Sequence, residues 1–191
     1  MKIRLYTYQS EAAVDILKST GVLKITKDSE KYTHPGRDDS INHPFDYPYQ
    51  VMIDKMKEKL PPSDPDITYP FWAWYKMRGK YIPIKHFDKI HRGLYRITFE
   101  IDTSLVLLSD FDMFCYLISG GLYFAYDEKE EEELSSHLFD DAKIYYYPNL
   151  ERMFDYKHNR NPRFTSSYQA ETIQAAFWKL ELNQVVDIQK V

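Results

Sequence analysis

Hydrophobic and polar residues alternate in three parts of the chain, and this alternation predicts β-strands. Residues Ile3–Tyr8 place Ile, Leu and Thr on one face and Arg and two Tyr on the other. Leu94–Ile101 alternates in the same way, which indicates a strand with one exposed face. In Phe71–Tyr75 two tryptophans alternate with Phe, Ala and Tyr, as in a strand buried on both faces. A short apolar run, Val22–Ile25, predicts a further strand.

Three other segments carry apolar residues at helical spacing. The first begins after Ser10, a good N-cap residue, and stops at Gly21. The second covers Tyr49–Leu60. The third begins at Ser109, which we expect to be the N-cap, with Asp112 three residues later completing a capping box. The acidic residues at this helix start are therefore explained without a metal ion.

The remaining segments are assigned by composition. Lys27–Pro48 is rich in Asp, Ser, Pro and Asn and predicts a long loop, and we expect Tyr81–Gly93 to be a loop as well. Ile173–Leu182 predicts a last long strand, although its apolar run also fits a helix. Together these elements predict an α+β fold in which a few helices flank a mixed, mainly antiparallel sheet.

Composition narrows the class of protein. The chain has 191 residues, of which 43% are hydrophobic, and this suits a single domain over residues 1–191. The net charge is −4, so the chain lacks the excess of basic residues that proteins use to bind phosphate backbones. Nucleic acid is therefore not an expected partner. No segment has the length of a membrane span, and the N-terminus turns polar too soon for a signal peptide. The lone cysteine suits a reducing cytoplasm, where we expect this protein.

No metal site is expected from the pattern of potential ligands. The six histidines include no pair at the i, i+4 spacing of a helical zinc site, and one cysteine offers no thiolate cluster. The acidic run Asp127–Glu133 lacks the glycine and alternating oxygen ligands of a calcium loop, so we interpret it as a solvated segment. Cys115 falls on the apolar stripe of its helix, as an inert buried thiol does.

The aromatic stretch Tyr69–Lys80 has two interpretations. It is either a core strand with a charged exit, or the wall of a pocket for a flat ring, with Arg78 close enough to hold a phosphate. Successive strand residues point to opposite faces, so Trp74 and Tyr75 cannot both line one site.

Three segments carry a resemblance to a known family: YPFWAWYKMRGK at Tyr69–Lys80, VLLSDFDMF at Val106–Phe114 and QAAFWKLELNQV at Gln174–Val185. They resemble a bacterial and phage family of uncharacterised domains of unknown function. The N-terminal LYTYQ and LKSTGVL segments fit the start of that family, so the resemblance spans nearly the whole chain.

The order of elements is also similar to that of ADP-ribosyltransferase domains. In those domains a polar residue of the first strand, a Ser or Tyr of a middle strand and a Glu of a late strand surround NAD. The corresponding positions here are Thr7, Tyr8 or Gln9, then Trp72–Tyr75, then Glu171 or Gln174. The chain lacks the Ser-Thr-Ser triplet of the middle strand, and a glutamine at the late position would remove the carboxylate.

This resemblance implies an enzyme that uses NAD for ADP-ribosyl transfer or for glycohydrolysis. The implied cofactor-binding residues are Tyr8, Gln9, Trp74, Tyr75 and Arg78. Glu171 or Gln174 would orient the ribose as the catalytic residue. Two alternatives stay open. One is a binding module for a nucleotide or another small ring, without turnover. The other is a defence-associated domain that contacts a protein partner.

Overall fold

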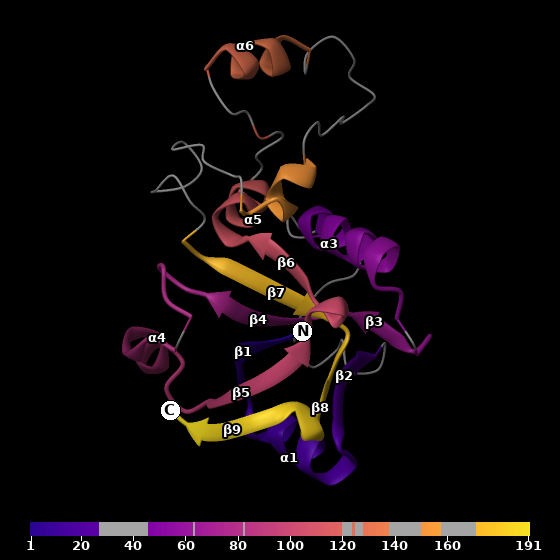
Figure 1. The fold of residues 1–191 in the computed structure, drawn as a ribbon, viewed down its shortest axis with the longest axis vertical. Helices are drawn as coiled ribbons and strands as arrows, with labels where there is room; N and C mark the ends of the chain where they lie inside the picture. Colours follow the sequence, from indigo (N-terminus) through magenta and orange to yellow (C-terminus); the bar gives the residue numbers. More distant parts are fainter. Residues whose placement is uncertain are drawn as a thin grey trace.

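The computed structural model describes residues 1–26, 46–62, 64–81, 83–119, 124, 128–137, 150–157 and 171–191. It has the expected α+β fold, with two antiparallel sheets and flanking helices (Figure 1). The larger sheet has the order β6-β7-β4-β1-β5-β9 and the smaller has the order β3-β2-β8. No helix in these ranges is long and apolar enough to cross a membrane.

The bounds of the elements are as follows. The larger sheet contains β1 (Lys2–Gln9), β4 (Phe71–Lys76), β5 (Tyr95–Asp102), β6 (Leu107–Asp110), β7 (Ile173–Phe177) and β9 (Val185–Lys190). The smaller sheet contains β2 (Val22–Thr26), β3 (Ile67–Tyr69) and β8 (Lys179–Glu181). The α-helices are α1 (Glu11–Thr20), α3 (Asp46–Lys59), α4 (Lys85–Ile90), α5 (Phe111–Ile118) and α6 (Glu128–His137). Three short 3-10 helices are η1 (Thr103–Leu105), η2 (Leu150–Phe154) and η3 (Leu182–Gln184).

The larger sheet separates two apolar cores. Val14 and Leu17 of α1 pack with buried strand residues such as Phe99 on one side. Helices α3 and α5 contribute Met52, Met56, Met113 and Leu117 to the other core. Ala175 belongs to the first core and Ala176 to the second, because neighbouring residues of a strand point to opposite faces. The run of buried residues in β7 is therefore explained by a central strand covered on both sides.

The first part of the chain folds as its pattern predicts. Ser10 caps α1, and its side-chain oxygen accepts a hydrogen bond from the backbone N–H of Ala13. Gly21 ends the helix with φ of 80°, a left-handed conformation in which glycine is not strained. Strand β2 then turns back into the smaller sheet.

The structure corrects several element predictions. Tyr81–Gly93 contains α4, which was missed because this six-residue helix buries no side chain completely and so shows no apolar stripe. Ile173–Leu182 forms two strands in different sheets, with Trp178 between β7 and β8. The start of α5 is capped by Asp110, whereas Ser109 belongs to β6. Of Lys27–Pro48, residues 27–45 lie outside the described ranges, and the last three residues belong to α3.

Strand β1 lies at the centre of the sheet and is paired unequally with its two neighbours. It pairs with β5 over its whole length, from Lys2 opposite Asp102 to Gln9 opposite Tyr95. Its pairing with β4 is restricted, within the described chain, to Tyr6 opposite Trp74. The sheet is therefore open between the C-terminal end of β1 and the N-terminal end of β4.

Candidate functional site

A pocket of about 480 Å³ lies at this opening in the sheet. It collects side chains from β1, β4, β7, α5 and the segment after α4. Its lining residues are Thr7, Tyr8, Gln9, Ile25, Tyr49, Tyr69, Pro70, Phe71, Trp72, Ala73, Trp74, His91, Phe111, Phe114, Cys115, Ile118 and Gln174. Its volume is in the range typical of small-molecule sites, roughly 300–1,000 Å³.

Side chains join the two strands where the backbone ladder stops. The hydroxyl of Thr7 donates a hydrogen bond to the backbone oxygen of Trp72 at 2.8 Å. The Gln9 amide donates to the same hydroxyl at 2.9 Å. Thr7 therefore takes up a carbonyl that a strand partner would otherwise use, and Gln9 is fixed at the edge of the pocket.

Helix α5 forms an aromatic wall. Asp110 starts it by accepting hydrogen bonds from the backbone N–H groups of Asp112, at 2.9 Å, and Met113, at 3.3 Å. Phe111 and Phe114, one turn apart, then face the pocket. Their rings contact the two tryptophans of β4.

The two tryptophans lie on one face of β4, because they are two residues apart. The Trp74 ring lies edge to face against Phe111, with 4.8 Å between ring centroids. The Trp72 ring contacts Phe114 at 5.1 Å. Both tryptophans are half-buried and line the pocket, so each has its orientation set by α5 while keeping ring surface towards the cavity.

Tyr8 and His91 form a second aromatic part of the lining. Their rings stack with 4.0 Å between centroids and an angle of 9°. The Tyr8 hydroxyl donates to Asp88 at 2.8 Å, and Asp88 also pairs with Arg96 at 2.5 Å. Burial, followed by the hydrogen bond to Asp88, raises the pKa of Tyr8 well above its usual value. The phenol therefore stays neutral and acts as a donor at physiological pH.

Gln174 supplies a neutral amide to the pocket. Its side chain is 3% exposed and donates a hydrogen bond to the hydroxyl of Ser109 at 3.1 Å. None of the described lining residues is Asp, Glu, Lys or Arg. The arrangement suits a flat ring whose edge carries hydrogen-bonding groups, since aromatic faces and amide groups dominate the lining.

Four of the site residues expected from the sequence line this pocket: Tyr8, Gln9, Trp74 and Gln174. Tyr75, Arg78 and Glu171 are not among its described lining residues. The Tyr75 ring packs against Tyr81, and Arg78 lies in the turn after β4 with φ of 47°. The backbone oxygen of Glu171 accepts a hydrogen bond from the N–H of Gly79.

Ile25, Tyr49, His91 and the α5 residues are lining residues that sequence reasoning did not place at a site. The apolar stripe of α5 was visible, and Cys115 was placed on it, but periodicity cannot tell a core contact from a pocket wall. Cys115 is half-buried at the pocket. No sequence signal marked His91. Among the described residues, no group of three His, Cys, Asp or Glu side chains lies close enough together to hold a metal ion.

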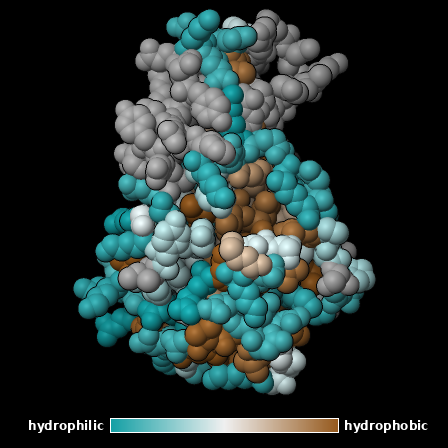
Figure 2. All heavy atoms as spheres, in the orientation of Figure 1, coloured by the Kyte–Doolittle hydropathy of each residue, from teal (hydrophilic) through white to brown (hydrophobic). Residues whose placement is uncertain are grey.

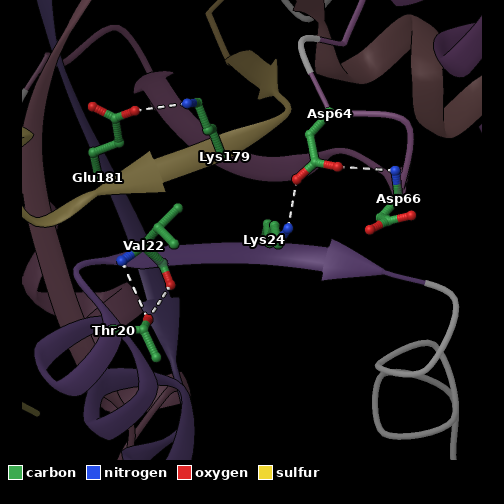
Figure 3. A network of polar contacts seen from close by, with 7 residues as sticks. All are labelled: Thr20, Val22, Lys24, Asp64, Asp66, Lys179 and Glu181. Carbon is green, nitrogen blue, oxygen red and sulfur yellow. Dashed lines mark hydrogen bonds and ion pairs between the residues drawn. The ribbon is translucent and has the colours of Figure 1, made fainter.

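A second hollow lies on the smaller sheet and is different in character (Figure 3). Lys24 of β2 lies opposite Lys179 of β8. Lys24 pairs with Asp64 at 2.5 Å, and Lys179 pairs with Glu181 at 2.7 Å. The hydrogen bond from Lys24 lowers the pKa of Asp64. These four charges are compensated within the protein, which makes this hollow a weaker candidate than the aromatic pocket.

Among the described residues, the exposed large apolar side chains are spread over several elements. Figure 2 shows brown, apolar patches separated by hydrophilic positions on the side that it displays. The most exposed large apolar side chains after Met1 belong to different elements, including Ile90 on α4, Val186 on β9 and Ile16 on α1. The aromatic pocket is therefore the best-defined candidate site.

Comparison with known proteins gives one match. A family model described as a domain of unknown function (DUF3841) matches residues 4–186. This range includes every described residue that lines the pocket. No curated protein and no solved structure matches the chain.

Proposed function

The chain belongs to the DUF3841 family, and we propose that it binds the flat aromatic ring of a nucleotide such as NAD in the pocket between β1 and β4. One observation supports this proposal most directly. Tyr8 and Gln9, Trp74, and Gln174 come from three different strands and line the same pocket. These are the strands that the resemblance to ADP-ribosyltransferases would put around NAD.

Stacking would supply most of the binding free energy. A base or nicotinamide ring placed against Trp74 gains roughly 1–3 kcal/mol from stacking, by comparison with other aromatic platforms. Trp74 is already oriented by Phe111 on one side and by Phe87, with 6.1 Å between ring centroids, on another. Because the ring is oriented before the ligand arrives, little side-chain entropy is lost on binding.

Polar groups at the pocket would orient the edge of the ring. Gln9 and Gln174 each carry an amide whose N–H₂ donates to a neighbouring hydroxyl. Each amide also has an oxygen that can accept a hydrogen bond. A ring with an amide or amino substituent finds hydrogen-bond partners in these amides. The aromatic faces of the lining also suit the positive charge that the nicotinamide ring of NAD carries.

Binding without turnover is the form of the proposal that the geometry favours. Cleavage of the nicotinamide–ribose bond develops positive charge on the sugar, and a carboxylate close to that charge stabilises it. The late-strand position inside the pocket is Gln174, a neutral amide. NAD-using glycohydrolysis or ADP-ribosyl transfer is the second candidate, favoured by the same grouping of β1, β4 and β7 and requiring Glu171 or Gln174 to orient the ribose.

The first experiment is titration calorimetry with NAD, accompanied by an assay for released nicotinamide. We expect saturable binding with no nicotinamide above the level of a protein-free control. Release of nicotinamide would establish the second candidate. An absence of both binding and release would overturn the assignment of this pocket to NAD and would favour a protein-interaction role instead.

A further inference from the structure

His91 has its ring fixed by two independent contacts. Its Nδ1 lies 2.8 Å from the backbone oxygen of Phe87, and a carbonyl oxygen only accepts hydrogen bonds, so Nδ1 carries the proton. The backbone N–H of His91 donates to the same oxygen at 3.0 Å. The stack on Tyr8 then fixes the plane of the ring. The proton on Nδ1 and the orientation of the His91 ring are therefore set without a ligand.

A polar network holds this arrangement in place. The Tyr8 hydroxyl and Arg96 both bind Asp88, through different carboxylate oxygens, at 2.8 and 2.5 Å. Arg96 also donates to the side-chain oxygen of Gln189 on β9 at 2.5 Å. These contacts connect α4 to β1, β5 and β9. Since α4 buries no side chain completely, the network and the ring contacts hold the helix beside the pocket.

In the neutral ring, the proton on Nδ1 leaves the lone pair on Nε2 of His91. This atom has no hydrogen-bond partner among the described residues, and His91 lines the pocket. We propose that Nε2 of His91 accepts a hydrogen bond from an N–H group on the bound ring, which makes the pocket selective for rings with a donor such as a carboxamide. The inference rests on the proposed function and names the substituent that the pocket recognises.

The selectivity has a physical reason. In the neutral tautomer Nε2 can only accept, so a ligand that brings a methyl group to it leaves the acceptor without a partner and displaces water from it. Leaving a polar atom unsatisfied costs more than a hydrogen bond contributes in net terms. We therefore expect a ligand with an N–H donor at this place to bind roughly tenfold more tightly than one with a methyl group there.

The test compares NAD with 3-acetylpyridine adenine dinucleotide, in which a methyl group replaces the N–H₂ of the carboxamide. Calorimetry should give roughly tenfold tighter binding of NAD by the unmodified protein. Two substitutions of His91 extend the test. His91→Phe keeps a ring to stack on Tyr8 but has no nitrogen. His91→Asn offers an amide N–H₂ near the position of Nδ1, for the Phe87 carbonyl, but nothing at Nε2.

We expect both variants to bind the two dinucleotides with nearly equal affinity, with NAD weakened and the analogue little changed. A merely structural role for His91 would weaken both ligands equally and leave their ratio intact, which would overturn the inference. Equal affinities in the unmodified protein would overturn it as well, while leaving the proposed function standing. If neither dinucleotide binds, the proposed function fails, and this inference fails with it.

Discussion

Tyr6 of β1 lies directly opposite Trp74 of β4, and Trp74 lies directly opposite Gln174 of β7. The three side chains therefore form one row on one face of the sheet. Beyond Tyr6 the described residues of β1 have no backbone pairing with β4, and the pocket occupies the space. The row thus contains the described pairing between β1 and β4, and Trp74 belongs both to the sheet and to the lining of the pocket.

Replacing Trp74 should test the stacking surface. We expect Trp74→Ala to weaken NAD binding by roughly 1–3 kcal/mol, because the ring loses its aromatic platform, and Trp74→Phe to retain part of the affinity. Calorimetry measures the loss. Tyr81→Ala is the matched control, since Tyr81 is 55% exposed and is not among the lining residues. Equal affinities for Trp74→Ala and the control would exclude this pocket.

The cap of α5 should contribute to the free energy of unfolding. Asp110 is completely buried and accepts two backbone N–H groups, so Asp110→Ala should lower the free energy of unfolding by about 1–2 kcal/mol. Asp110→Asn should lose less, because asparagine is an equally good N-cap residue. Urea unfolding measures both. Indistinguishable midpoints for the two variants would show that capping does not stabilise α5.

The stability of the protein should fall in strong alkali, in part through Tyr6. Burial, followed by the charge of Asp88, raises the pKa of Tyr6 from 10.0 to about 12. The neutral phenol is thus favoured in the folded state, and its contribution is complete below pH 10. It is lost between pH 10 and 12, where the unfolded state ionises first, and amounts to roughly 3 kcal/mol.

Tyr6→Phe is the variant that isolates this effect. The Tyr6 hydroxyl is buried without a hydrogen-bond partner among the described groups, so its removal should leave stability at neutral pH unchanged or increase it by about 1 kcal/mol. Unfolding at several pH values should then show a smaller alkaline loss than in the unmodified protein. A large loss at neutral pH would mean that the hydroxyl does have a partner.

The one cysteine of the chain offers a direct readout of pocket occupancy. Burial, then the nearby carboxylates of Asp112 and Asp110, raises the pKa of Cys115, so alkylation should be slow at neutral pH and faster as the pH rises. With NAD at ten times its Kd, about one pocket in eleven is free, and the rate should fall roughly tenfold. Mass spectrometry of iodoacetamide-treated protein measures this rate. An unchanged rate, despite binding by calorimetry, would put the ligand away from α5.

Much of the fold was accessible from local sequence patterns. Alternation identified β1, β4 and β5, and the cap residues Ser10 and Gly21 identified α1, because both signals follow from side-chain directions that repeat along one element. The expected membership of a family of uncharacterised domains is confirmed by the match to DUF3841. Four of the pocket residues, Tyr8, Gln9, Trp74 and Gln174, were also predicted from the sequence as site residues.

Tertiary structure decided what these patterns do not encode. Helix α4 is held by contacts between aromatic rings and by the hydrogen bonds of Asp88, and not by a row of buried apolar side chains. Its sequence therefore shows no apolar periodicity. The division of the late apolar run at Trp178 depends on which sheet each half joins. The pocket exists because β1 pairs with β5 over its whole length, whereas its described pairing with β4 is limited to Tyr6 and Trp74, two residues far apart in the sequence. Alternation shows which way each side chain points, but where two strands part is set by contacts between distant segments.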